Sequence, residues 1–238
     1  MKEPGTTASI SGKLNDISTG RAAVIAGIAL ILMTVLGPFA NFSVLLGLLV
    51  PDDAAKTVAN IMASGEKFRI GIACFLFVAV LDVIVAWALY VFLKPANKSI
   101  SLLAAWFRIV YAAMLAVILV YLLEVLQLTG DGSYLSAFDQ SQINAQVMLA
   151  LNNFSTGWQF SLIIFGIHLL LLGHLFFWSD YTPRYLGVLL AIAGLGYMTD
   201  GLGKTLVPGY DLTVAMFTFI GEVVLVFWLL IKGRKIIL

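Results

Sequence analysis

Charged side chains are scarce in this sequence. Only 11% of the 238 residues are charged and 61% are hydrophobic, whereas a typical soluble domain is about 25% charged and about 45–50% apolar. This balance excludes an ordinary soluble domain and favours an integral membrane protein. The formal net charge is +1, so there is no electrostatic reason to expect a nucleic-acid partner.

Cysteine and histidine are nearly absent. The single cysteine, Cys74, cannot form an internal disulfide and is expected to pack as a small apolar residue. The two histidines, His168 and His174, are six residues apart, so on one helix they point to different faces and cannot chelate one ion together. No serine motif with flanking glycines indicates a hydrolase. We therefore expect no metal, no cofactor and no catalytic residue, and the sequence leans away from an enzyme.

Long apolar runs dominate what remains. A membrane-spanning helix needs about 20 apolar residues to cross about 30 Å of hydrocarbon, and six runs are long enough. They cover residues 22–48, 67–93, 102–128, 156–178, 184–206 and 212–230. The sequence therefore predicts an all-α, polytopic membrane bundle of six transmembrane helices, with a polar tail over residues 1–20 and a single transmembrane domain over residues 21–238.

Local signals refine this picture at the helix ends. Pro38, with Gly37 before it, predicts a kink in the outer half of the first span. Pro95 is expected to stop the second span, and Ser99 or Ser101 is expected to cap the third.

Two longer connections are expected to hold short helices at the outer membrane interface. In the first, Asp52 is a candidate cap, and Val58, Ile61 and Met62 form one apolar stripe at helical spacing. In the second, residues 141–153 form a helical segment with polar residues throughout, so we expect it to lie at the interface as well.

Basic residues favour one orientation of the bundle. One side holds nine of them and the other holds four, with Arg108 inside a span. The nine are Lys2, Lys13, Arg21, Lys94, Lys98, Arg184, Lys232, Arg234 and Lys235, and the four are Lys56, Lys67, Arg69 and Lys204. Because the cytoplasmic side carries the excess of lysine and arginine, we expect both termini to be cytoplasmic, in a cell inner membrane.

Several short stretches resemble a bacterial membrane family known only as domain of unknown function 4386. The most specific are Leu81–Val83, Leu93–Asn97, Phe107–Arg108, Gly166–His168, Gly194–Tyr197, Pro208–Tyr210 and Gly221–Glu222. The resemblance covers residues 22–233 and implies a bacterial protein with several spans. It implies no activity.

Asp82 and Arg108 are the first candidate site. Asp82 lies twelve residues before Lys94, about 18 Å from the cytoplasmic end of its helix, and Arg108 lies about 10 Å from the same side. A short link makes the two helices antiparallel neighbours, and both charges sit among small residues that allow close approach. We predict a buried ion pair, which either fixes the register of the two helices or serves substrate or proton movement.

His168 and Glu222 are the second candidate site. Each lies ten residues from the cytoplasmic end of its span, near mid-membrane depth, so a neutral histidine could hydrogen-bond the carboxyl group there. With Asp82 they would form a polar centre drawn from three spans. Such a centre is either a proton relay or ligand site, or a set of interhelical hydrogen bonds that holds the bundle together.

An outer polar cluster is the third candidate. Glu124, Asp200 and Lys204 are its main members, and Asp200 and Lys204 have the i, i+4 spacing of a helical ion pair. Further polar residues expected near them are Asn41, Lys67, Arg69, Asp131, Asp139 and Asp211. The cluster is either an outward-facing pocket or a hydrated membrane boundary.

Three classes of function remain open. The first is a non-catalytic structural or accessory membrane protein, with membrane lipids and other subunits or a second copy of itself as partners. The second is a small transporter or proton-linked permease that uses Asp82, His168 and Glu222. The third is an intramembrane enzyme acting on lipid, for which histidines and acids are few.

Overall fold

Six long apolar helices form the part of the chain that this computed structural model describes, residues 17–237. Residues 1–16 of the predicted tail lie outside it. In chain order the elements are α1 (Thr19–Pro38), the π-helix η1 (Phe39–Leu45), α2 (Leu46–Leu48), α3 (Ala54–Ala63), α4 (Gly65–Leu93), α5 (Lys98–Leu128), the 3₁₀ helix η2 (Ser133–Ala137), α6 (Gln140–Trp178), α7 (Arg184–Leu206), α8 (Ala215–Thr218), α9 (Ile220–Ile231) and the 3₁₀ helix η3 (Gly233–Lys235). The predicted helical membrane bundle is confirmed.

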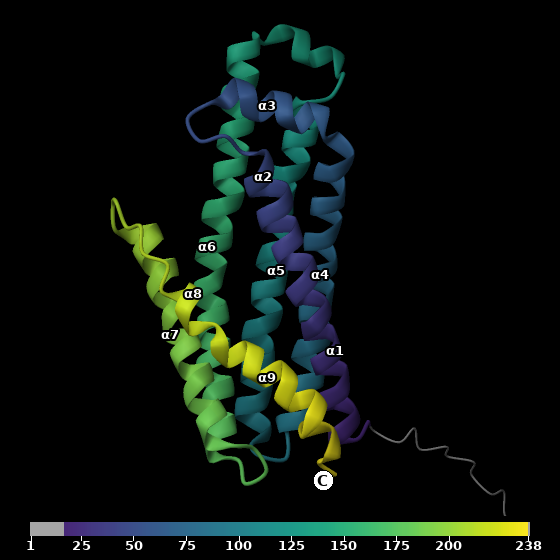
Figure 1. Cartoon of the computed structure of the whole chain (residues 1–238), viewed down its shortest axis with the longest axis vertical. Helices are drawn as coiled ribbons and strands as arrows, with labels where there is room; N and C mark the ends of the chain where they lie inside the picture. The colour runs from purple at the N-terminus through teal and green to yellow at the C-terminus, as the bar shows by residue number, and fades with distance from the viewer. Residues whose placement is uncertain (1–16, 238) are drawn as a thin grey trace, which may run out of the picture.

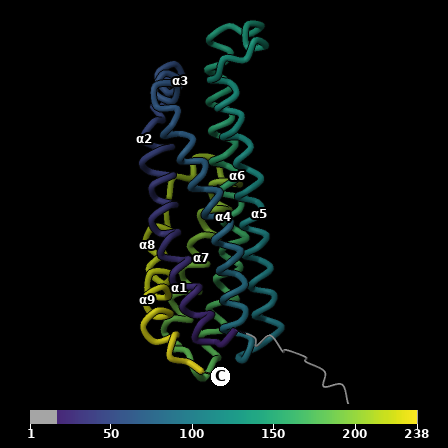
Figure 2. Tube along the Cα trace, turned by 90° about the vertical axis from the view of Figure 1, so that its right-hand side faces the viewer, coloured from purple at the N-terminus to yellow at the C-terminus, as the bar shows by residue number. Residues whose placement is uncertain are grey.

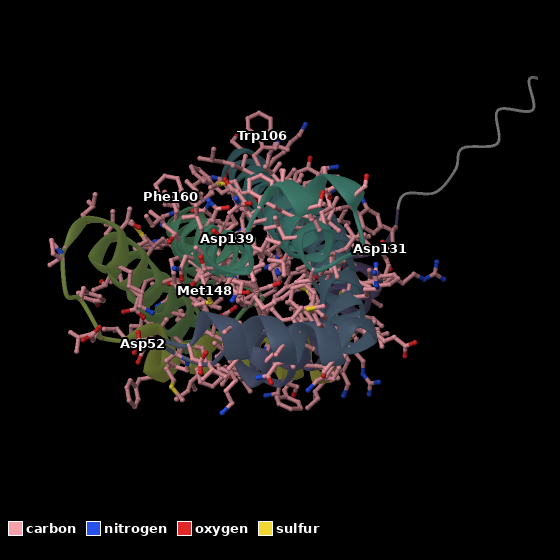
Figure 3. The ribbon with its side chains drawn as sticks, turned by 90° about the horizontal axis from the view of Figure 1, so that it is seen from above. Asp52, Trp106, Asp131, Asp139, Met148 and Phe160 are labelled. Carbon is pink, nitrogen blue, oxygen red and sulfur yellow. The ribbon has the colours of Figure 1, made fainter. Side chains whose placement is uncertain are left out.

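The helices stand side by side along one axis. In Figure 1, α4, α5 and α6 run the length of the molecule, while α7, α8 and α9 occupy its lower half. The start of α1, the α4–α5 link, the α6–α7 turn and the C-terminus lie together at the lower end. Large apolar side chains face outward around the bundle. Trp106 is 57% exposed and Phe160 is 49% exposed, and both lie at the periphery when the molecule is seen from above (Figure 3).

The first span changes its helix type at the proline where the sequence predicts a kink. Proline has no backbone N–H to donate to the carbonyl four residues back, so the regular pattern of α-helical hydrogen bonds fails there. The chain stays helical but widens into the seven-residue π-helix η1 directly after Pro38. Such π-segments occur where the α-helical hydrogen-bond ladder is disturbed.

The short helix α3 is present, but a different residue caps it. The side chain of Asp53 accepts a hydrogen bond from the Lys56 backbone N–H at 2.8 Å. Asp52, the expected cap, instead occupies the turn after Pro51 with φ 60°. Val58 and Ile61 are buried as predicted, whereas Met62 is 60% exposed. α3 lies beside the outer part of the bundle at the upper end (Figures 1 and 2).

The expected separate interfacial helix over residues 141–153 is wrong. These residues begin α6, a continuous helix of 39 residues that is about 58 Å long. Asp139 starts it with a capping box, because its side chain accepts from the Gln142 N–H and the Gln142 side chain accepts from the Asp139 N–H. The polar residues belong to a solvated outer extension, whose Val147 and Ala150 are buried in a cluster with residues of α3. The absence of glycine and proline between residues 140 and 156 was a signal for continuity.

The short α4–α5 link makes these two helices antiparallel neighbours. The side chain of Asn97, rather than Ser99 or Ser101, caps α5 by accepting from the Ile100 N–H at 3.0 Å. Ser101 instead donates its hydroxyl to the Tyr90 carbonyl of α4 at 3.1 Å. This cross-link sets the register of the two helices near their lower ends.

The C-terminal spans differ from the others. α7 packs against α6 through glycines, and a Cβ atom at Gly194 would lie 2.6 Å from the Gly166 carbonyl oxygen. The sixth span covers Ala215–Lys235 but is divided into α8, α9 and η3, with α9 only 12 residues long. In Figure 1 it crosses the lower half of the bundle obliquely.

Candidate functional site

Three of the charged and polar residues that the sequence singles out, Asp82, Arg108 and His168, lie at one depth. Asp82 is twelve residues from Lys94, Arg108 is ten residues from Lys98, and His168 is ten residues from Trp178. At 1.5 Å per residue, each lies about 15–18 Å from the lower end of its helix. All three are buried, with exposed fractions of 0% for Asp82, 2% for Arg108 and 1% for His168. We call these three side chains the central triad.

Asp82 and Arg108 are in contact. Arg108 Nη2 lies 2.7 Å from Asp82 Oδ1, which makes an ion pair between α4 and α5. The distance is short, but neither Asp82 oxygen accepts a well-oriented hydrogen bond from any described residue, and Arg108 Nε has no partner there. Charge attraction between Nη2 and Oδ1 therefore joins the two groups. Such a pair has no aqueous competition in the interior.

His168, on α6, contacts the same arginine. Its Nε2 lies 3.2 Å from Arg108 Nη1, and its Nδ1 lies 2.8 Å from the Ala104 carbonyl oxygen. Arginine can only donate, so Nε2 accepts and Nδ1 carries the hydrogen that it donates to Ala104. The contacts therefore require a neutral histidine. Both ring nitrogens are engaged, so the predicted hydrogen bond from His168 to Glu222 is not formed.

An aromatic ring lies against the guanidinium and packs against two further rings, which sequence reasoning missed. Arg108 Cζ lies 5.3 Å from the centre of the Phe165 ring, in a cation–π arrangement. Phe165 in turn contacts Tyr111, with ring centres 4.8 Å apart, and the edge of Tyr197 at 5.4 Å. Phe165 and Tyr111 were detectable, because Phe165 precedes His168 by three residues and Tyr111 follows Arg108 by three, so each shares a helix face with its charged neighbour.

Glu222 approaches the triad from α9. It is half-buried, and its Oε1 is shielded from solvent without a hydrogen-bond partner among the described residues. Its carboxyl group interacts with the Tyr197 hydroxyl and lies within electrostatic reach of Arg108 and Asp82. Glu222 therefore belongs to the same polar centre, with Tyr197 and Arg108 in place of the expected histidine.

The centre is closely packed. Small buried residues surround both charges, as the sequence indicates, among them Ala79 and Ala86 on α4 and Ala104 and Ala112 on α5. A crevice beside His168, lined by Ala86, Ala104 and other residues of α4, α5 and α6, has no room for the centre of a water molecule. The triad therefore lies in a dry region between three helices.

Within the outer cluster, Asp200 is bound by a loop and not by Lys204. Asp200 is buried, and Oδ1 accepts from the Tyr210 hydroxyl and the Val214 N–H, both at 2.9 Å, while Oδ2 accepts from the Ala215 N–H at 2.7 Å. These bonds fold the segment after α7 back onto it. No ion pair links Asp200 to Lys204 within residues 17–237, because both carboxylate oxygens serve this loop. Lys204 and Glu124 are exposed.

The remaining histidine is separate from the triad. His174 is exposed, and its ring lies 6.5 Å from that of Trp178. In the described part of the chain, no three histidine, cysteine, aspartate or glutamate side chains gather as a set that could hold a metal ion.

Comparisons with known proteins give a family without an assigned activity. A family model described as a domain of unknown function (DUF4386) matches residues 25–233. An uncharacterised protein of Archaeoglobus fulgidus is 40% identical over 159 residues, which is 67% of this chain and 81% of that protein. No solved structure matches.

Proposed function

Because this chain belongs to the family described as a domain of unknown function (DUF4386), we propose its function from the geometry of the polar centre. We propose a non-catalytic membrane protein whose central triad is a structural tie between α4, α5 and α6. Burial of Asp82, Arg108 and His168 to 2% exposure or less carries this proposal. A site that processes a substrate needs a route to it, and the crevice beside the triad does not admit water.

The structural tie formed by the central triad supports an accessory role within a larger membrane assembly. With its polar groups engaged in holding helices together, such a protein acts through its outer surface, where lipids and other subunits or a second copy bind. The two outer elements, α3 and the extension of α6, offer a surface beyond the hydrocarbon core for such contacts.

The test compares native assemblies. Membranes expressing the wild-type chain or Asp82→Asn/Arg108→Gln are extracted mildly and separated by native electrophoresis. We expect a species larger than the chain alone, with the same size in both cases, because the variant lacks the charges but keeps the outer surface. A lone chain in wild-type membranes would contradict the accessory role. The Asp200→Asn variant is a control for general damage at another buried acid.

A proton-linked permease is the second candidate. The buried Oε1 of Glu222 favours it, because a mid-membrane carboxyl group with one oxygen unpartnered is suited to gaining and losing a proton. Proton uptake into proteoliposomes, followed with a pH-sensitive dye, would be lost in Glu222→Gln if this candidate were right.

We also propose the orientation and location. The lower end carries Arg21, Lys94, Lys98, Arg184, Lys232, Arg234 and Lys235 among the described residues, and the upper side carries Lys56, Lys67, Arg69 and Lys204. This excess supports cytoplasmic termini in a cell inner membrane.

A further inference from the structure

One half-buried acid is not used by the structural tie. Glu222 lies in the first turn of α9, and its Oε1 has neither solvent contact nor a hydrogen-bond partner among the described residues. A buried carboxylate left without partners is costly, so such a group is expected to be neutral or to gain a partner.

The groups around Glu222 come from three other helices. On α7, Tyr197 interacts directly with the carboxyl group. On α5 and α4, Arg108 and Asp82 act on it electrostatically, and Glu222 acts in turn on Tyr111 of α5.

The other two elements packed against α9 are α1 and η3. α1 contributes no titratable side chain between residues 22 and 38. The basic residues of η3, Arg234 and Lys235, lie twelve or more residues along the chain from Glu222, at the end of the span.

Counting charges in this enclosed set leaves one negative charge in excess. Asp82 and Arg108 cancel each other in their ion pair. His168 is neutral, since its Nε2 accepts from Arg108 while its Nδ1 donates to Ala104. An ionised Glu222 would therefore give the apolar centre a net charge of minus one, with no counter-charge of its own.

We infer that the polar centre binds a single exchangeable proton and that Glu222 holds it, beside the Tyr197 hydroxyl at the contact of α7 with α9. The protonated carboxyl group brings the set to neutrality. Because Glu222 is only half-buried while the triad is sealed, this proton is the one within reach of the bundle surface. The inference concerns protonation and holds whether or not the protein is an accessory subunit.

A hydrophobic carbodiimide tests the inference on the purified full chain in detergent. N,N′-dicyclohexylcarbodiimide reacts with a protonated carboxyl group in an apolar setting, and the whole reagent adds to form a stable N-acylurea. We expect one adduct, mapped by mass spectrometry to Glu222, that forms more slowly as the pH rises. The Glu222→Gln variant should lose it, and the Glu124→Gln variant, which changes an exposed acid, should keep it. A folded wild-type protein without a Glu222 adduct in acidic and neutral buffer would overturn the inference.

Asp82→Asn gives the sharper result. Removing this negative charge leaves Arg108 in need of a counter-charge, so Glu222 should ionise. Its labelling near neutral pH should then fall at least about tenfold, as expected if its affinity for the proton becomes tenfold weaker. Unchanged labelling in the folded variant would overturn the inference that Asp82, Arg108 and Glu222 balance their charges as one set.

Infrared spectroscopy provides a measurement that needs no Asp82 variant. The carbonyl band of a protonated carboxylic acid should be present in the wild-type protein and absent in Glu222→Gln. A band that persists in that variant at full strength would assign the proton to another acid and overturn the inference.

Discussion

At the scale of single residues, the molecule keeps a full ion pair in its driest region. The desolvation of two charges is expensive, and Coulomb attraction repays it only while both partners are present. Here Arg108 is also held by His168 and by the face of Phe165, so three groups compensate one guanidinium. Replacing either Asp82 or Arg108 alone should therefore lower the free energy of unfolding more than replacing both together.

The first prediction is a double-mutant cycle on Asp82 and Arg108. Asp82→Asn and Arg108→Gln should each lower the free energy of unfolding by about 3–5 kcal/mol, because each removes one partner of the buried ion pair. The double variant should recover part of this loss. Thermal unfolding in detergent measures the effect, with Glu124→Gln as the exposed control. A double variant no more stable than the worse single variant would contradict the tie.

The second prediction compares the two histidines of α6. His168→Phe keeps an aromatic ring but removes the acceptor for Arg108 and the donor to Ala104, so it should lower the free energy of unfolding by about 1–3 kcal/mol. His174→Phe makes the same change at an exposed position and should shift the unfolding temperature little. Equal shifts in the two variants would show that the hydrogen bonds of His168 contribute no stability.

At the scale of helices, α6 and α7 depend on paired glycines. A Cβ atom at Gly166 would meet the Gly194 carbonyl oxygen at 2.6 Å, and the reverse contact has the same distance. Gly173 and Gly187, seven residues from the first pair on each helix, repeat this reciprocal contact. Small residues at such positions let membrane helices approach closely. Because Tyr197 follows Gly194 by three residues on α7, the close approach of the two helices also places Tyr197 beside the polar centre.

The third prediction tests this contact with one added methyl group. Gly194→Ala should lower the free energy of unfolding by about 1–3 kcal/mol, because backbone atoms must move apart to accept the Cβ. Gly37→Ala is the matched control, since a Cβ there meets nothing within 4 Å. Unfolding temperatures in detergent give the comparison, and similar losses at both positions would argue against the glycine contact.

The fourth prediction concerns the outer start of α6. Hydrogen bonds from the Ser141 hydroxyl and then the Gln142 N–H lower the pKa of the Asp139 carboxyl group below its usual value. The cap should therefore contribute fully above the unfolded pKa of about 4 and be lost as the pH falls through the lower folded value. Hydrogen exchange at neutral pH over residues 140–145 should accelerate in Asp139→Ala and stay nearly unchanged in Asp139→Asn, which still caps. Equal protection in both variants would exclude the cap.

The sequence predicts contacts between helices that a short link joins, but not contacts that depend on how distant helices are rotated. The Asp82–Arg108 contact was predictable because a short link and a count of residues along two helices place both charges at one depth. The partners of His168 were not, because a long connection separates α5 from α6 and leaves their relative rotation free. Asp200 was assigned to Lys204 by helical spacing, but the backbone N–H groups that bind it belong to a loop fourteen and fifteen residues later.

At the scale of the whole molecule, the arrangement of the helix ends makes the orientation testable. Asn97, in the α4–α5 link, lies at the lower end, and Ser136, in η2, lies in the connection between the upper ends of α5 and α6. Both are exposed, whereas the native Cys74 is buried.

The fifth prediction uses these positions in a Cys74→Ala background. A membrane-impermeant maleimide applied to spheroplasts should label Ser136→Cys. It should label Asn97→Cys only after the membrane has been permeabilised. The reverse pattern would place the termini outside. Cys74→Ala alone should remain unlabelled in both conditions and serves as the control.

The short C-terminal helix has a consequence for the surrounding lipid. The sixth span, Ala215–Lys235, would rise about 32 Å over its 21 residues if it stood upright as one helix. It is divided into α8, α9 and η3 and inclined across the bundle (Figure 1), so it covers less than the about 30 Å of hydrocarbon in an average bilayer. On the opposite side, α5 rises about 46 Å over its 31 residues. A bilayer adapts to such hydrophobic mismatch by thinning beside the shorter segment. The protein should therefore sit in an asymmetric annulus of lipid, with a local depression of the membrane next to Glu222.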